Sequence, residues 1–454
     1  MSHAQLVRMV LHVTAYVSLF RSTAMGYGYP TYLEPGQVDF ALLGAMNYVV
    51  AAFGILYVAV DAPFVAKALL HSPVVLAFGA VLLLTVAGSE DPLLSLRSFF
   101  VVLVVTLPAL AIAARFGVDH AFEVVRRFCV FAVFLNLAYS LAFPHYAFQG
   151  GLSGFLRGMF SHKNAFGPFM AIAFVIVLPG WRGLDLRHLR MKELANAAAC
   201  AIALVFVALS RSASAWVMIA AFPGLYVGCR LILSIRNSYY RASTWLISVV
   251  SVSVAALLTY IFLFQTLLLQ LGRDETLTNR TKIWAALLDL VKDKPWLGHG
   301  FGLFSRPEAF ARYWGEFGWE ATSTHSTYIE LLLNIGYIPV AVLALIVVRN
   351  LWISVVHCDE APRRVMVRRQ VIIVLVLISG VSEASRLMGG SFFWLVFVTC
   401  LFVSFKGVKP SVRARAAGTF YELRENRLRH ARAGVPSVGR AHHVRELDGR
   451  RRST

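Results

Sequence analysis

Four short polar clusters separate hydrophobic stretches of this chain, and their residue types suit the binding of an anion and the transfer of a proton. Guanidinium groups and the free amides of a helix start match phosphate oxygens in geometry and charge. An imidazole with an unperturbed pKa of about 6.5 can accept a proton from a hydroxyl. The clusters are Arg157 with His162, Lys163 and Asn164; Ser210 with Arg211; Arg280 with Lys282; and His325.

Arg280 and Arg211 stand where an isolated cation is disfavoured. Arg280 falls in the first turn of a predicted helix, where the positive end of the helix dipole favours acidic residues, so a cation there indicates a nearby anion. The alternative is a solvated loop arginine. Arg211 joins two predicted membrane spans with almost no loop, and a charge costs about 2.5 to 3.5 kcal/mol deep in a bilayer and less near its surface. We therefore expect Arg211 to have an oppositely charged partner.

His325 and Glu383 each have a structural and a functional interpretation. A single histidine near a helix start often only caps the helix, but hydroxyl side chains surround His325 and favour a role as a proton acceptor. Glu383 and Arg386 are three residues apart, close enough to pair on one helix face, and a structural ion pair is the favoured interpretation. The hydroxyl residues beside His325 are Ser323, Thr324, Ser326 and Thr327.

The composition excludes a water-soluble globule and predicts an all-α, polytopic membrane helix bundle. Of the 454 residues, 58% are hydrophobic and 15% are charged, against about a quarter charged in soluble domains. Apolar runs near or above about 17 residues recur, whereas barrel strands would be about ten residues long and alternating. We predict about twelve membrane helices. They are His3–Phe20, Val38–Val60, Pro73–Gly88, Ser98–Ala114, Phe128–Phe148, Asn164–Trp181, Leu194–Leu209, Ala213–Leu233, Trp245–Leu271, Thr327–Val348, Val371–Met388 and Ser391–Val403.

The Lys and Arg residues of the short loops predict the orientation, because positive residues remain on the cytoplasmic side. If the amino terminus is cytoplasmic, the basic loops and the carboxyl terminus are also cytoplasmic, and the four polar clusters face the periplasm. The first hydrophobic run is interpreted as a retained helix, with a signal peptide as the alternative. The predicted cytoplasmic segments are Arg115–Arg127, Arg182–Lys192, Arg230–Arg241, Arg349–Arg369 and the tail from Lys406.

The chain divides by hydropathy and charge into four regions. Residues 1–271 are predicted to hold nine membrane helices, 272–325 a periplasmic loop, 326–405 three further membrane helices, and 406–454 a basic, disordered cytoplasmic tail. Much of the net charge of +19 lies in that tail, which is expected to contact anionic membrane lipids rather than nucleic acid. The loop begins with an amphipathic helix expected to lie along the membrane surface, and its later aromatics fit a headgroup-level belt or core better than a sugar-stacking platform. The stripe of that helix is Ile283, Trp284, Leu287, Leu288 and Val291, and the later aromatics are Phe310, Tyr313, Trp314, Phe317 and Trp319.

Several motifs are absent from the sequence, and their absence narrows the chemistry. There is no Gly-Lys-Ser/Thr phosphate loop, so ATP is not expected to drive a reaction. The inner loops carry no Asp-x-Asp pair, and His299 and His325 lack neighbouring carboxylate or cysteine residues that would complete a zinc site. We therefore expect neither a metal ion nor another cofactor.

These residues resemble the O-antigen ligase and Wzy-type polysaccharide polymerase superfamily of bacterial envelopes, over most of the membrane core. The resemblance is carried by the order of the motifs and by their predicted outward placement. The matching residues are Arg157-Gly158 with His162-Lys163-Asn164, Ser210-Arg211, Arg280 four residues before Trp284, Pro295-Trp296-Leu297-Gly298-His299-Gly300, and His325 with Tyr328.

The resemblance implies a GT-C type membrane fold and a metal-independent, inverting glycosyltransferase. It implies that a glycan is taken from undecaprenyl diphosphate on the periplasmic face of the inner membrane, with His325, Arg280 and Arg211 as the catalytic residues. It further implies a substrate-binding set of Arg157, His162, Lys163, Asn164, Lys282 and Tyr328.

Three questions remain open at the level of sequence. Asn commonly follows the histidine in this family, and Ser326 stands there in this chain. The preferred activity is polymerisation of surface or exopolysaccharide repeat units, in which case a chain-length regulator is a candidate partner. The alternative is ligation of O-antigen to lipid A-core, and a lipid-linked oligosaccharide flippase is the competitor from another class.

Overall fold

The computed structural model describes most of the hydrophobic part of the chain. The described residues are 2–25, 40–70, 73–149, 154–178, 191–270, 280–305, 308–311, 313, 315, 323–358, 363–384, 387 and 390–401. The predicted basic tail, 406–454, lies outside them, and so does Arg386 of the predicted Glu383–Arg386 pair. Both remain predictions.

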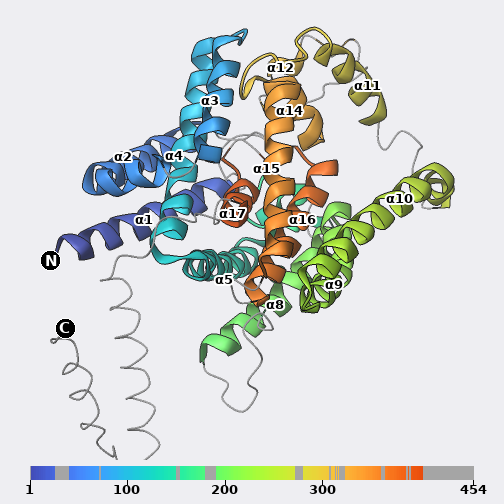
Figure 1. Ribbon diagram of the computed structural model, residues 1–454, viewed down its shortest axis with the longest axis horizontal. Coiled ribbons are helices and arrows are strands. Elements are labelled where there is room, and N and C mark those ends of the chain that lie inside the picture. Colours follow the sequence, from blue (N-terminus) through green and yellow to red (C-terminus); the bar gives the residue numbers. More distant parts are fainter. Residues whose placement is uncertain are drawn as a thin grey trace, which may run out of the picture. The chain divides into compact units, whose positions relative to one another are not determined.

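The fold is all-α, as the composition predicts (Figure 1). Within the described residues the only strands are two of two residues each, β1 (Phe148–Gln149) and β2 (Phe155–Leu156), which pair antiparallel. The helices are α1 (His3–Thr23), α2 (Phe40–Leu70), α3 (Pro73–Ala87), α4 (Pro92–Phe116), α5 (Val118–Ala142), α6 (Pro144–Ala147), α7 (Lys163–Val177), α8 (Met191–Ser210), α9 (Ala213–Ser234), α10 (Ser238–Gln270), α11 (Arg280–Val291), η3 (Leu303–Ser305), α12 (Glu308–Ala311), α14 (Thr327–Ile335), α15 (Tyr337–Val356), α16 (Arg363–Ser382) and α17 (Phe392–Leu401).

Local sequence explains several helix boundaries. Ser2 and Gln5 form a reciprocal capping box at the start of α1. At the start of α4, the Asp91 carboxylate accepts a hydrogen bond from the Leu94 amide at 2.9 Å, and Pro92 occupies the first turn, where a missing N–H costs nothing. These caps fix the residues at which α1 and α4 begin.

A helix occupies each of the predicted membrane ranges. Within the described residues, seven helices are long and apolar enough to cross a membrane, and three further apolar helices are shorter. The multi-pass membrane architecture is therefore confirmed, whereas the count of about twelve spans stays a prediction. The seven are Ala45–Ala68, Pro92–Phe116, Val118–Ala142, Met191–Ser210, Ala213–Ser234, Tyr337–Val356 and Arg363–Ser382.

One predicted span is wrong, because the run Thr327–Val348 is not a single helix. It is broken at Gly336, whose φ of +70° ends α14 and begins α15. The residues on both sides of the break are apolar, so hydropathy cannot detect it. As a result α14 belongs with the outer loop and α15 is the membrane-crossing candidate.

The segment Pro295–Gly300 holds this break in place. Backbone hydrogen bonds join the segment to both sides of the joint between α14 and α15, at distances from 2.7 to 3.1 Å. A Cβ on Gly336 would lie 2.5 Å from the carbonyl carbon of Trp296, so no side chain fits there. The residues of the joint that take part in these bonds are Leu333, Asn334, Tyr337 and Ile338.

Replacing Gly336 by alanine is expected to destabilise the fold. The positive φ adds about 1–3 kcal/mol of backbone strain, and the clash with Trp296 adds about 1–3 kcal/mol of overpacking. Thermal unfolding of purified protein in detergent measures this as a lower midpoint. Gly228→Ala is the matched control, since a Cβ there meets nothing within 4 Å. Equal midpoints for Gly336→Ala and the wild type would contradict the expected strain.

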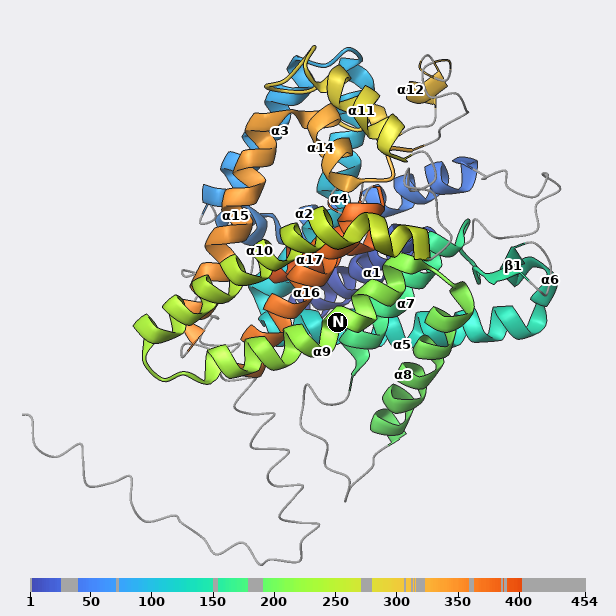
Figure 2. The ribbon, with the colours of Figure 1, turned by 90° about the vertical axis from the view of Figure 1, so that its right-hand side faces the viewer.

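The apolar stripe of the loop helix α11 packs on protein, whereas the expected place of the helix along the membrane surface stays a prediction. Ile283, Leu287 and Val291 of its stripe are at most 1% exposed, and they form a small hydrophobic core with α14, η3 and α12. Leu288 alone of the predicted stripe is well exposed. Phe310 is fully buried in the same core, as its interpretation as a core residue predicts. Figure 2 shows α11 beside α14.

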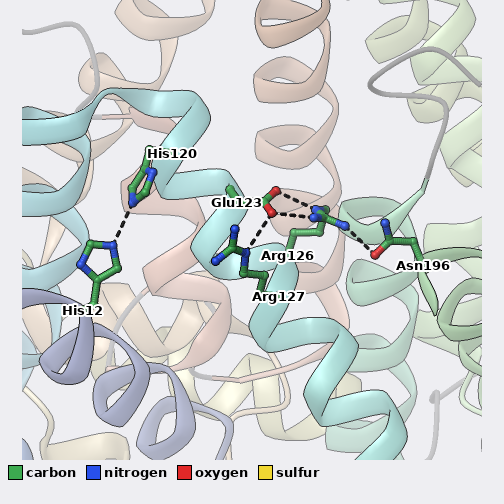
Figure 3. A network of polar contacts seen from close by, with 6 residues as sticks. All are labelled: His12, His120, Glu123, Arg126, Arg127 and Asn196. Atoms are coloured by element: carbon green, nitrogen blue, oxygen red, sulfur yellow. Dashed lines mark hydrogen bonds and ion pairs between the residues drawn. The ribbon is translucent and has the colours of Figure 1, made fainter. Parts of the chain in front are cut away.

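Charged residues gather at one end of α5, where they pair with each other. Glu123 accepts hydrogen bonds from Arg126 at 2.6 Å and from Arg127 at 2.9 Å, as Figure 3 shows. Asp119 accepts from Arg368 of α16 at 3.0 Å. This end of the bundle lies in the segments predicted to be cytoplasmic. Three of its arginines, Arg126, Arg127 and Arg368, therefore have carboxylate partners.

Candidate active site

Phe155 brings together two of the predicted clusters. The Lys163 ammonium lies 3.5 Å from the centroid of the Phe155 ring, and the Arg211 guanidinium carbon lies 5.6 Å from the same centroid. A cation over an aromatic face is attracted by the ring quadrupole. Two cations that are far apart in sequence therefore occupy one site.

The segment before α7 is fixed by its backbone. The Arg157 guanidinium donates to the carbonyl oxygens of Tyr146 at 3.1 Å and Ser161 at 3.2 Å, which sets its orientation without neutralising its charge. Gly158 has a φ of +54°, and a Cβ there would lie 2.4 Å from Asn136 Oδ1. This explains why glycine follows Arg157.

His162 is the N-cap of α7. Its Nδ1 accepts a hydrogen bond from the Asn164 amide at 3.2 Å, which orients the imidazole at the start of the helix. Lys163 is the first residue of the helix. The three residues predicted to bind substrate here are thus adjacent at a helix start, where free amides favour an anion.

Arg211 occupies the turn between α8 and α9, as predicted. It has a φ of +48°, and the turn is held by Ser210 and Ser212, both fully buried, through a hydrogen bond from the Ser212 amide to Ser210 Oγ at 3.3 Å. The expected charged partner is not found among the described residues. Arg211 is exposed and contacts the ring of Phe155 instead.

His325 lies on a similarly constrained turn. Its φ is +51°, and Thr324 and Ser326 on either side are joined by hydrogen bonds of 2.8 and 3.3 Å. The indole of Trp284 donates to the Thr324 carbonyl at 2.9 Å and so ties the turn to α11. In the described chain, the non-glycine residues with positive φ are Ala24, Arg211 and His325. Such strain, of about 1–3 kcal/mol per residue, tends to cluster at functional sites.

Burial and two nearby cations keep the His325 imidazole neutral. Burial, with smaller contributions from the charges of Arg280 and His162, lowers the pKa of His325 to about 4. The imidazole is therefore neutral near neutral pH. Among the described residues it has no hydrogen-bond partner, so both ring nitrogens are available to a ligand.

The end of α16 connects the two arms of the site, and the sequence did not reveal this role. Arg280 donates to the Ser382 carbonyl at 3.0 Å. The next residue, Glu383, accepts a hydrogen bond on its carboxylate from Ser214 of α9 at 3.2 Å and one on its carbonyl from Thr327 of α14 at 2.5 Å. Glu383 therefore links the turn of Arg211 to the turn of His325.

Lys282 and Tyr328, which are both predicted to bind substrate, differ in their contacts. Lys282 is exposed on the first turn of α11, two residues from Arg280, with no hydrogen bond or ion pair in the described part of the chain. Tyr328 donates its hydroxyl to the Leu377 carbonyl at 2.7 Å and so joins α14 to α16. That bond gives Tyr328 a structural role beside the site, and its predicted contact with substrate is untested.

His299 of the Pro295–Gly300 motif is structural. Its side chain is 4% exposed, its Nδ1 lies 2.6 Å from a carboxylate oxygen of Glu90, and its Nε2 lies 3.0 Å from the Leu290 carbonyl. His299 therefore has one carboxylate neighbour, which is fewer than the clustered ligands that a zinc site needs. Glu90 precedes α4 and is far away in sequence, so residue spacing gave no sign of this pair.

Four cations of the site lack carboxylate partners in the described residues, whereas three arginines at the opposite end of the bundle have them. The four are Arg157, Arg211, Arg280 and Lys282, and the three are Arg126, Arg127 and Arg368. Helix α16 shows the contrast along its length, because Arg368 at one end pairs with Asp119 and Ser382 at the other contacts Arg280. Such a concentration of unneutralised charge attracts an anion from outside the protein.

Comparison with known proteins gives two matches. Residues 198–346, which contain Arg211, Arg280 and His325, match the family model described as O-antigen ligase. The exopolysaccharide production protein ExoQ of Rhizobium meliloti (strain 1021) is 29% identical over 290 residues, which are 60% of this chain and 63% of that protein. The match thus spans less than two thirds of the relative's length. The chain is a multi-pass membrane protein, and about a third of it is similar to the O-antigen ligase family model.

Proposed function

We propose that this protein is a glycosyltransferase of polysaccharide biosynthesis. It moves a glycan from an undecaprenyl-diphosphate-linked donor to a sugar hydroxyl at the periplasmic face of the bacterial inner membrane, and so polymerises repeat units of a surface or exopolysaccharide. The observation that carries the proposal is the group of unpaired cations beside a neutral imidazole. The family match and the exopolysaccharide relative support it.

The diphosphate of the donor is the anion that the cations would hold. As the bond between the anomeric carbon and the diphosphate oxygen breaks, negative charge grows on that oxygen. Arg211 and Arg280 stabilise this charge. Hydrogen bonds fix the backbone turn of Arg211 and orient the Arg280 guanidinium before substrate arrives. Arg157, Lys163, Lys282 and the helix start at His162 and Asn164 complete the anion pocket.

His325 acts as the general base. The acceptor hydroxyl oxygen forms a bond to the anomeric carbon from the face opposite the leaving group, so the configuration inverts. The hydroxyl proton passes to a ring nitrogen of His325, and the bonding electrons leave with the lipid diphosphate. The imidazolium then returns its proton to water.

Donor binding makes His325 a stronger base. In the free protein the charge of Arg280 helps to hold the pKa of His325 near 4. A diphosphate bound at Arg280 offsets that charge, which raises the pKa of the imidazole. The base therefore gains proton affinity when the substrate to be attacked is present.

The same residues would serve a ligase, an alternative that the name of the matching family model favours. The two activities differ in acceptor, which is another lipid-linked repeat for a polymerase and lipid A-core for a ligase. A flippase would move the lipid-linked glycan without breaking a bond.

Purified protein in vesicles with lipid-linked repeat units separates these possibilities. A polymerase is expected to give a ladder of longer glycans together with released undecaprenyl diphosphate. Transfer only to added lipid A-core would indicate a ligase. Movement of the lipid-linked glycan across the vesicle bilayer with neither product would refute the proposed enzyme and support a flippase.

Transfer is expected to be unaffected by chelators. Arg211 and Arg280 would supply the positive charge that a divalent cation supplies to the leaving group in other transferases. The rate of ladder formation in excess EDTA should match the rate in added Mg²⁺. A rate that collapses in EDTA and returns with the metal would show that the arginines are not sufficient.

A further inference from the structure

A groove between α2 and α4 lies apart from the helices that carry the proposed catalytic residues. Its volume is about 70 Å³, and Phe100, Val101 and Val104 form an apolar wall on the α4 side. Further along the two helices, a Cβ on Gly54 would lie 2.8 Å from Val104 Cγ1, so the helices are in contact there. The groove is therefore a pocket with an apolar wall, and it is closed at the end nearer Gly54.

The rim of the groove carries polar groups with unused donors. Arg21 donates through Nε to Asn47 Oδ1 at 2.6 Å, and because a guanidinium only donates, the Asn47 amide nitrogen is turned away from it. Arg97 and Tyr48 also line the groove, and both are exposed. Among the described residues, Asn47 Nδ2, the Arg97 guanidinium and the Tyr48 hydroxyl have no hydrogen-bond partner.

The groove rim and the catalytic residues are at the same end of the bundle. Arg21 donates to the carbonyl of Gly390 at 3.0 Å, and Gly390 lies on the connection from α16 to α17. Glu383, at the start of that connection, contacts the site through Ser214. The opposite ends of α2 and α4 are joined by the ion pair of Asp61 with Arg115.

We propose that this groove holds the headgroup and the first part of the tail of a second lipid, the polyprenyl-diphosphate-linked molecule that presents the acceptor glycan. The inference rests on the proposed function, because transfer between two lipid-linked glycans needs a place for two diphosphates. Arg211 and Arg280 hold the one that leaves. The unpaired donors of Arg97, Asn47 and Tyr48 suit the other, and the apolar wall suits its isoprenoid chain.

Two-substrate kinetics with purified protein test the assignment. Arg97→Ala is expected to raise the KM for the lipid-linked acceptor about tenfold or more, while the KM for the donor changes by less than about twofold. Ala51→Leu narrows the groove without removing a charge and is expected to raise the same constant. Arg230→Ala, an exposed arginine in a predicted cytoplasmic segment, is the control for loss of a positive charge and should leave both constants unchanged. An unchanged acceptor KM in both groove variants would overturn the assignment.

Competition with bulk lipid identifies the occupant and does not need turnover. A short-chain prenyl diphosphate with a photoreactive tail is expected to label α2 or α4 of the wild type, and Arg97→Ala should lose this labelling. Excess phosphatidylglycerol vesicles should compete poorly. If phosphatidylglycerol displaces the probe as well as unlabelled prenyl diphosphate does, the groove holds ordinary phospholipid and the proposal is wrong. If the probe labels the groove but the protein makes no polymer, the proposed function fails while the lipid site in the groove stands.

Discussion

Arg211→Ala and Arg280→Ala are each expected to lower glycan transfer by about 10²–10³-fold, the usual effect of removing one preorganised donor to a developing charge. The structure gives the physical reason, because neither guanidinium has a carboxylate partner in the described residues. Arg211 lies on a turn held by the Ser210 hydroxyl, and the Ser382 carbonyl orients the Arg280 guanidinium. The rate of ladder formation at saturating donor is the measurement. The loss should appear in kcat as well as in kcat/KM, since the charge develops in the transition state.

Conservative and distant variants distinguish a site effect from misfolding. Arg211→Lys and Arg280→Lys keep the charge but lose the bidentate fork, so partial activity is expected. Arg230→Ala removes a comparable charge from an exposed position and should leave the rate unchanged. If Arg211→Ala and Arg280→Ala have normal thermal stability and normal rates, the arginines do not hold the leaving group.

His325→Asn is expected to lower kcat by about 10²–10⁴-fold, the range for loss of a general base. Asparagine is a more informative substitution than alanine, because it tolerates the φ of +51° at this position. It also keeps a hydrogen-bonding side chain while it loses the basic nitrogen. The ladder assay and a thermal-unfolding control are run on the same preparation. A variant that keeps kcat and changes only KM would assign His325 to binding alone.

The pH dependence of the wild type gives an independent test of the same residue. The neutral imidazole is the active form, so kcat/KM should rise with pH through about 4 and then stay level. The acid limb of kcat should lie at higher pH, because a bound diphosphate raises the pKa of His325. In Arg280→Lys the limb of kcat/KM should stay near its wild-type position, since the charge is kept. In the wild type the charge of Arg280 lowers the pKa of His325, so in Arg280→Ala that pKa rises and the limb should move to higher pH. An acid limb that is the same in all three proteins would contradict the coupling.

The sequence predicts the helices of the fold better than it predicts the contacts between them. Hydropathy is averaged over a window of residues, so it locates apolar helices. It cannot detect the break at Gly336, where a φ of +70° ends one helix within an apolar run. The same limit applies to α11. Its stripe of apolar residues predicts an amphipathic helix but does not show whether membrane or protein covers the stripe, and the structure shows protein.

Pairings between distant residues could not be predicted for a related reason. The sequence indicates that Lys163 and Arg211 each favour an anion, but nothing in it places both over Phe155. Glu383 was interpreted through its helical neighbour Arg386, whereas its contacts with Ser214 and Thr327 come from other helices. Such contacts depend on tertiary packing, which one sequence does not reveal.

Product inhibition measures most directly whether the unpaired cations hold the departing lipid diphosphate. At saturating lipid-linked acceptor, which fills the groove between α2 and α4, a short-chain prenyl diphosphate should inhibit transfer competitively with the donor. Its inhibition constant should rise about tenfold or more in Arg211→Lys and Arg280→Lys, because a lysine cannot reproduce the bidentate contact, and should be unchanged in Arg230→Ala. The same inhibition constant in all four proteins would show that the diphosphate binds elsewhere and would contradict the proposed mechanism.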